Sequence, residues 1–290
     1  MDWFAISLAC AYFMSTSEVF SKLLLRDNDE WTTGCGMVLA SLPFMAPLIM
    51  GRDSLPLSRD LLLLVSIAIP FEILAYYIYL SAIRIAPLSL SVPYLSFTPV
   101  FAILTAALVL QERISSKGFA GILMVTVGAY VLNIERFVHH PLAPLREIFK
   151  SPGSRRMLTV ALIWSLTSTL GKKGVQLSDP VFFGVFYTVS LSIPMLLIAG
   201  WRIKHGPATV NLKGRNTVWL ILGGFVMALA TISHFHAIKL APVSYMIAVK
   251  RTSLIFSVLY GGLIFKEDRI RLRLLGTGIM LSGAVMLYLA

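Results

Sequence analysis

Residues 82–89 read AIRIAPLS, and residues 237–244 read AIKLAPVS, 155 positions later. The same spacing joins further identical pairs: Phe101 and Phe256, Leu104 and Leu259, Glu112 and Glu267, Gly121 and Gly276, Gly128 and Gly283. A shared apolar composition produces fewer matches than this, and the polar matches gather at turns. The beginnings of the two stretches match more weakly, with Lys22 against Lys173. The chain therefore consists of two related halves.

Each half contains five apolar segments that are long enough to cross a bilayer, which takes about 20 residues. The ten predicted spans are 3–25, 31–50, 61–83, 86–110, 116–134, 155–177, 180–201, 217–238, 241–265 and 272–289. Because five is odd, the two halves have opposite orientations, as in many secondary transporters. The sequence predicts an all-α integral membrane protein, with two inverted five-helix repeats at 1–134 and 155–290 joined by a linker at 135–154. A duplication kept only for packing is the alternative interpretation.

The composition agrees with a membrane protein. The chain is 57% hydrophobic and only 13% charged, with a mean hydropathy of +0.80, whereas soluble domains carry about 25% charged residues. This excludes a conventional soluble enzyme, a disordered protein and a disulfide-stapled secreted domain. Cys10 and Cys35 lie in apolar runs and form no metal-binding spacing. The first segment lacks a basic start, so we expect a retained span and not a cleaved signal peptide.

The net charge of +11 has two contributions. Of 25 Lys and Arg residues, 15 fall on the loops of one predicted side and five on the other, with the remaining five inside the spans. This imbalance reports membrane topology and not a nucleic-acid partner. Basic loops face the cytoplasm, so this count predicts that both termini lie outside the cell.

Several short motifs occur twice in corresponding places: Ala86-Pro87 and Ala241-Pro242, Gln111-Glu112-Arg113 and Lys266-Glu267-Asp268, Gly121 and Gly276, Gly128 and Gly283. With ten spans in two halves, they resemble the drug/metabolite transporter superfamily, EamA type, over residues 3–289. The resemblance implies a multi-pass carrier of the plasma membrane without a cofactor, and a cavity lined largely by spans three, four, eight and nine. It also implies cytoplasmic termini, in conflict with the count of basic loops.

Charged residues inside the spans are the best candidates for function, because each costs at least about 2.5 kcal/mol at a helix centre unless it faces a cavity or a partner. Lys250-Arg251 in span nine is the strongest signal. Arg offers a planar fork for a carboxylate or phosphate, and Lys adds a mobile positive charge. An anionic ligand is one interpretation, and permanent neutralisation by Glu18 and Glu72 is the other. Lys172 and Lys173 lie near a span end, where we expect them to extend to the interface.

The Lys250-Arg251 pair also resembles the Lys-Arg of span nine in triose-phosphate and nucleotide-sugar translocators. That resemblance implies a grip on an anionic headgroup. The plastid carriers add a lysine from the first half, which span four of this chain does not supply. A carboxylate therefore suits the site as well as a phosphate.

The acidic residues allow more than one role. Glu18 and Lys22 are four residues apart, so they share a helix face and can pair with each other. Glu72 has no such neighbour, and its face continues to Tyr76. It is a candidate proton carrier or a counter-ion for Arg251.

Further candidate contacts are polar or aromatic residues in the spans. We predict Tyr76, Tyr94, Tyr245 and His236 as substrate contacts, with Tyr94 between Pro93 and Pro99, which interrupt span four. His234 and His236 point about 200° apart, which does not suit a shared metal on one helix. The sequence contains no nucleotide-binding, metalloprotease or nucleophile motif, so no catalytic residue is predicted.

The sequence therefore predicts a secondary transporter of a small anionic or zwitterionic metabolite, working by alternating access in the cell membrane. Expected partners are the substrate, membrane lipid and either protons or a counter-substrate. The first alternative is an exporter of cationic or aromatic compounds or amino acids that uses Glu72 and aromatic residues. The second is a membrane enzyme or partner subunit that transports nothing.

Overall fold

Polar side chains lie between the helices of this protein and apolar side chains cover its outside. The computed structural model describes residues 2–52, 54–85, 92–132, 151–206, 210–211, 213–265 and 270–290. Ser7, Ser165 and Thr169 are completely buried, whereas Leu63 and Leu197 are 53% and 69% exposed. Soluble proteins show the reverse preference. The arrangement suits a lipid environment, in which polar and small side chains join the helices.

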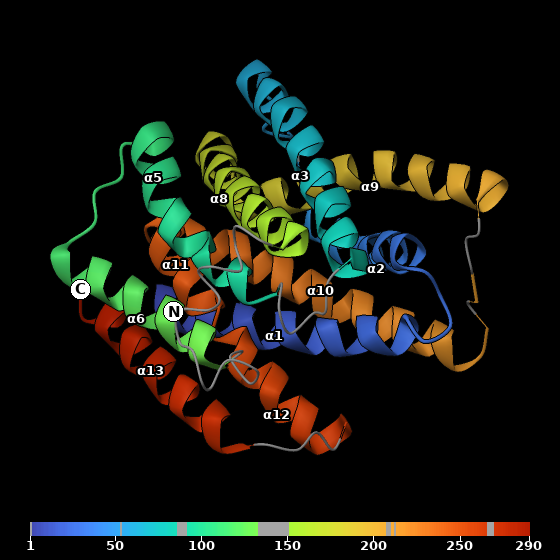
Figure 1. Cartoon of the computed structure of the whole chain (residues 1–290). Coiled ribbons are helices and arrows are strands. Elements are labelled where there is room, and N and C mark those ends of the chain that lie inside the picture. Colours follow the sequence, from blue (N-terminus) through green and yellow to red (C-terminus); the bar gives the residue numbers. More distant parts are fainter. Residues whose placement is uncertain are drawn as a thin grey trace.

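Every regular element in the described residues is a helix (Figure 1). The elements are α1 (Trp3–Leu24), α2 (Glu30–Met45), η1 (Ala46–Leu48), α3 (Arg59–Ile85), η2 (Val92–Phe97), α5 (Thr98–Leu110), α6 (Ser116–Leu132), α8 (Pro152–Leu177), α9 (Pro180–His205), α10 (Arg215–Leu240), α11 (Val243–Lys250), α12 (Ser253–Phe265) and α13 (Ile270–Tyr288). The Ala86-Pro87 turn, the Lys266-Glu267-Asp268 motif and residues 135–150 of the predicted linker lie outside the described residues.

Four helices in the described residues are long and apolar enough to cross a membrane by themselves. They are α1, the Arg59–Tyr79 part of α3, α9 and α10. Tyr94–Leu110, Ser116–Leu132 and Leu275–Tyr288 are shorter apolar helical segments. This composition identifies the protein as a helical membrane protein.

Three predicted spans are not uniform α-helices in the described residues. Span two passes from α2 into the 3₁₀ segment η1 at Ala46. Span four begins with the 3₁₀ segment η2 and becomes α5 at Thr98, with Pro99 in the first turn. Proline fits a first helical turn because it has no N–H to donate there. Span nine was predicted as one helix, and this is wrong: α11 ends at Lys250 and α12 begins at Ser253. Between them Thr252 N donates to Val249 O (2.9 Å) and Leu254 N to Arg251 O (3.1 Å), which is 3₁₀ bonding.

The repeated glycines form one helix–helix interface. In Figure 1, α6 and α13 lie side by side. A Cβ atom on Gly128 would lie 2.8 Å from the carbonyl oxygen of Gly276, and one on Gly121 would lie 3.1 Å from that of Gly283. Only glycine permits this approach, so the last helices of the two halves pack backbone to backbone.

The connections gather at two opposite ends of the helices. Contacts join 46–58 to 178–179 and 111–115 to 241–245, and the aromatic rings of Phe4 and Tyr288 are 5.1 Å apart at the same end, which we call face 1. At the other end, called face 2, Asn211 N donates to Asn28 Oδ1 (2.6 Å) and joins the α1–α2 and α9–α10 connections. Since α1 contains 22 residues, the two faces lie about 33 Å apart.

Candidate functional site

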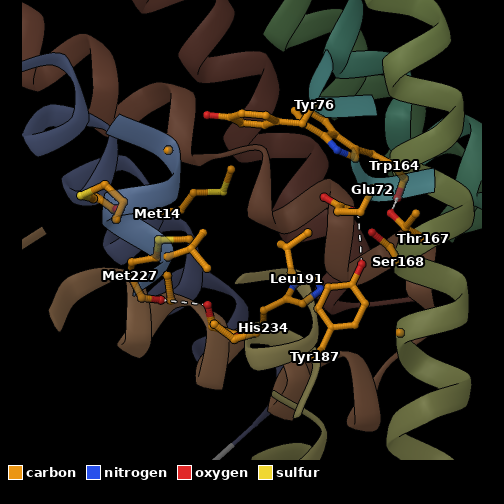
Figure 2. Close-up of a pocket in the computed structure, with 18 of the residues that line it drawn as sticks. Met14, Glu72, Tyr76, Trp164, Thr167, Ser168, Tyr187, Leu191, Met227 and His234 are labelled. Atoms are coloured by element: carbon orange, nitrogen blue, oxygen red, sulfur yellow. Dashed lines mark hydrogen bonds between the residues drawn. The ribbon is translucent and has the colours of Figure 1, made fainter. Parts of the chain in front are cut away.

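A cavity of about 470 Å³ lies between the helices. Its walls come from α1, α2, α3, α8, α9, α10 and α11, with Thr98 as the contribution of α5 among the described residues. The expectation that spans three, four, eight and nine supply most of the lining was therefore too narrow, because spans one, two, six and seven supply more than half of the described lining residues. Figure 2 shows the part of the cavity around Glu72.

Two cations line the cavity where span nine is interrupted. Lys250 is the last residue of α11, and Arg251 lies in the turn to α12. Arg251 Nη2 donates to Thr98 Oγ1 (2.6 Å), while Arg251 Nε is buried and finds no hydrogen-bond partner within the described residues. In the part of the chain that the structure describes, the side-chain ammonium of Lys250 makes no hydrogen bond or ion pair. The helix break therefore presents two incompletely satisfied cations to the cavity.

Two carboxylates line the same cavity. Glu72 accepts a hydrogen bond from the Tyr187 hydroxyl (3.3 Å), and Glu18 accepts one from Ser257 Oγ (3.2 Å). Among the described residues, neither carboxylate forms an ion pair with Lys250 or Arg251. The cavity therefore carries equal numbers of acidic and basic side chains that are not joined directly to each other.

Aromatic side chains surround Glu72. Trp164 and Thr167 of α8 lie beside it in Figure 2, and Tyr187 approaches from α9. The indole nitrogen of Trp164 is buried and has no hydrogen-bond partner in the described residues. Tyr76 lies one turn further along α3, and its hydroxyl donates to Glu30 O (3.3 Å). The result is a carboxylate at the edge of an aromatic surface.

The remaining wall is apolar and adaptable. Four methionines line it: Met14, Met37, Met195 and Met227. Methionine is flexible and polarisable, so such a wall accommodates apolar groups of varied shape. The cavity thus joins charged groups of both signs to a large apolar surface.

The predicted site residues divide into two groups. Lys250, Arg251, Glu72, Glu18 and Tyr76 line the cavity together. Four others lie elsewhere: Tyr245, Tyr94, His236 and Lys22.

Each of these four has a different environment. The Tyr245 hydroxyl bonds Ser115 Oγ (3.2 Å) at face 1, and Tyr94 is 2% exposed in a cluster with Ala75 and Met157. His236 Nδ1 lies 2.8 Å from Ile232 O, and Lys22 is exposed near the end of α1. In this structure they do not face the cavity.

Sequence analysis missed several lining residues. His234 lines the cavity in place of His236, and its Nδ1 atom is buried without a hydrogen-bond partner in the described part of the chain. In α8, Trp164, Thr167, Ser168 and Gly171 all line it. Their spacing of three, four and seven residues marks one helix face, so a polar face in an apolar span was the available signal.

Lys172 differs from the expectation for a residue at a span end. It is 8% exposed and ion-paired with Glu112, and its ammonium also donates to Ala241 O (2.7 Å). Glu112 accepts from Val243 N as well (2.9 Å). The predicted extension to the interface is therefore wrong for Lys172, whereas the neighbouring Lys173 is exposed. The trio of Lys172, Glu112 and the Ala241–Val243 backbone ties α5, α8 and the start of α11 together at face 1.

The cavity extends toward face 2 and is sealed from face 1. Trp31 lines it next to the first residue of α2, and Ser21 lies one turn from the end of α1. Toward face 1, Phe183 and Phe235 pack edge to face with ring centres 4.9 Å apart in the main apolar cluster. The lining therefore reaches toward face 2, and an aromatic contact separates it from face 1.

A helical membrane bundle with a cavity that combines charged groups and an apolar wall is the class of protein to which small-molecule transporters belong. The model of the EamA-like transporter family matches residues 2–134 and 153–289, so the chain belongs to that family of multi-pass membrane transporters. A solved structure titled "Crystal structure of protein" is 17% identical, with a TM-score of 0.78, over 99% of this chain and 96% of that chain. It has the same fold. No curated protein matches the chain.

Proposed function

We propose that the protein is a secondary transporter of the plasma membrane, with ten spans arranged as two inverted repeats at 1–134 and 155–290. Four observations support this: the family match in two stretches, the 155-residue repeat, the two ends of the bundle, and the cavity between them. Transport proceeds by alternating access of the central cavity to the two faces.

The substrate is a small zwitterionic or anionic metabolite with an apolar part. The observation that carries this proposal is Lys250, an ammonium on the cavity wall without a hydrogen bond or ion pair in the described residues. A carboxylate or phosphate of the substrate would supply its partner, together with Arg251. Glu72 is available to a positive group, and the methionine wall to the apolar part.

The test compares ligand binding by the purified Lys250→Met and Lys173→Met proteins. Lys173 lies on the exposed side of α8 and provides a matched control. A panel of carboxylate, phosphate, zwitterionic and quaternary ammonium compounds is first screened for thermal stabilisation of the purified protein. The apparent affinity for the best zwitterion or anion is obtained from its thermal stabilisation of each protein. We expect Lys250→Met to weaken this affinity by about 100-fold or more, and Lys173→Met to leave it unchanged. Equal stabilisation of both variants contradicts the proposal.

Glu72 is the proposed coupling group, through proton binding or exchange against a counter-substrate. Its bond with Tyr187 and its position in the cavity support this role. Glu72→Gln keeps the shape and removes the charge. We expect it to abolish uptake driven by an imposed pH gradient while exchange between equal substrate pools continues. Undiminished gradient-driven uptake contradicts the assignment.

A second candidate function is export of cationic or aromatic compounds. The aromatic surface of Trp164, Tyr187 and Tyr76 around Glu72 favours it, because aromatic faces and a carboxylate both attract cations. In that case quaternary ammonium compounds stabilise the protein most, and Lys250→Met strengthens their binding. Absence of flux for every compound that stabilises the protein favours a membrane enzyme or partner subunit.

A further inference from the structure

Two aspartates begin corresponding helices of the two halves. Asp29 caps α2 by accepting hydrogen bonds from the backbone N–H of Trp31 (3.1 Å) and Thr32 (3.3 Å). Asp179 caps α9 in the same way, accepting from Val181 and Phe182 at 3.0 Å. The two caps are 150 residues apart. Asp29 is at face 2 and Asp179 is at face 1.

Each aspartate has an arginine partner from the other half, and the arginines are also 150 residues apart. Arg52, which follows η1, donates to Asp179 at face 1, and Arg202 near the end of α9 approaches Asp29 at face 2. The same register aligns Lys22 with Lys172, which corrects the alignment of Lys22 with Lys173 made from the sequence. The repeat therefore places one Asp–Arg contact between the halves at each face.

The two contacts are not equally complete. Arg52 donates two hydrogen bonds to Asp179, at 2.5 and 3.2 Å. Arg202 comes only to 3.9 Å from Asp29, and its Nε atom is buried without a hydrogen-bond partner among the described residues. The complete pair lies at face 1, which is sealed, and the incomplete pair lies at face 2, toward which the cavity extends.

We propose that Asp179–Arg52 and Asp29–Arg202 are equivalent gate contacts, and that the transport cycle breaks one pair as it completes the other. The inference rests on the proposed alternating-access function and adds the residues that control it. Both pairs lie outside the cavity lining, so neither touches the substrate.

The chemistry of the pairs suits repeated opening. Their side chains are between 11% and 32% exposed, and ion pairs that water reaches are individually weak. Each aspartate also keeps its backbone hydrogen bonds as a helix cap, so its charge stays solvated when the arginine departs.

The test measures access to the cavity from each side of the membrane. Ser168→Cys, in a background with Cys10→Ala and Cys35→Ala, provides one thiol on the cavity wall. A membrane-impermeant thiol reagent is applied to vesicles of both orientations. We expect the parent protein to react faster from face 2. Arg52→Gln raises the face-1 rate about threefold, and Arg202→Gln lowers it by a similar factor, because they destabilise opposite states.

Two kinds of variant control the experiment. Arg59→Gln at face 1 and Arg26→Gln at face 2 remove exposed arginines that form no ion pair in the described residues, and they leave both rates unchanged. Arg52→Lys and Arg202→Lys retain the pairs and keep rates near the parent values, which also shows that the positions tolerate substitution.

Specific outcomes overturn the proposal. These are equal shifts of Arg52→Gln and Arg202→Gln in the same direction, or shifts no larger than those of Arg59→Gln and Arg26→Gln. Labelling needs no substrate, so it separates the two ideas. If Arg52→Gln and Arg202→Gln shift the labelling rate in opposite directions but no flux is found, the gate contacts are supported and the transport function is rejected. If flux is found but the labelling rates are unchanged, only the gate contacts are rejected.

Discussion

Lys172 and Lys250 are both lysines inside apolar helices, yet the structure gives them opposite environments. Lys172 is ion-paired with Glu112 and also bonds a backbone carbonyl. Lys250 faces the cavity and makes no direct bond in the described residues. We propose that the paired charge of Lys172 belongs to the architecture and that the charge of Lys250 binds a ligand.

The largest effect on stability is expected where the paired lysine is removed. Lys172→Met leaves Glu112 buried without its cation, a change that costs about 3–5 kcal/mol in buried pairs. We expect the melting temperature in detergent to fall by about 10 °C. Lys173→Met, one residue away on the exposed side, changes it little. A Lys172→Met protein as stable as the parent would remove the contrast between the two lysines.

Replacement of Lys250 is expected to affect stability in the opposite way from replacement of Lys172. Lys250→Met breaks no hydrogen bond or ion pair of the described residues, and it removes a positive charge from the cavity wall. We expect the melting temperature without ligand to stay the same or to rise by up to about 5 °C. The stabilisation by substrate disappears at the same time. A marked loss of stability without ligand would assign Lys250 to the architecture, together with Lys172.

Sequence analysis could predict which residues are charged in the spans but not which lysine is paired. Span nine illustrates the reason. In span four, Pro93 and Pro99 indicate an irregular start, whereas the turn after Lys250 contains no proline or glycine. Arg251 is instead held by Thr98 of α5, and no pattern in the sequence of span nine itself predicts a contact between halves.

The aromatic residues illustrate the same limit. Tyr76 and Tyr245 look alike in the sequence, since both are tyrosines within predicted spans. Gly34 makes room for the Tyr76 ring beside the cavity, and Gly118 makes room for the Tyr245 ring at face 1. The helix faces that meet are decided by packing between distant segments. The repeat, the apolar segments and the paired glycines, in contrast, are local or periodic, and these predicted the helices and the family well.

The smallest expected effect on stability concerns the Asp179–Arg52 pair, which is more exposed than the Glu112–Lys172 pair. The hydrogen bonds from Arg52 hold the pKa of Asp179 below its ordinary value of 3.8. A carboxyl group with a lowered pKa in the folded state stabilises the fold above its ordinary pKa, and that contribution is lost as the pH falls through the folded value. The stabilisation is therefore fully present above the ordinary pKa of 3.8 and is lost as the pH falls through the lower pKa of the folded state.

Asp179→Asn keeps a capping side chain and removes the titrating group. We expect its melting temperature to lie about 1–2 °C below that of the parent at pH 6, because exposed ion pairs are weak. The difference should shrink as the pH falls from 4 to 3, since the parent carboxylate then becomes neutral. Thermal unfolding of the two proteins in parallel over pH 3–7 measures it, and acid effects common to both cancel. A difference in melting temperature that is independent of pH would mean that Asp179 acts only as a helix cap. The Asp179–Arg52 ion pair would then contribute nothing to the closure of face 1.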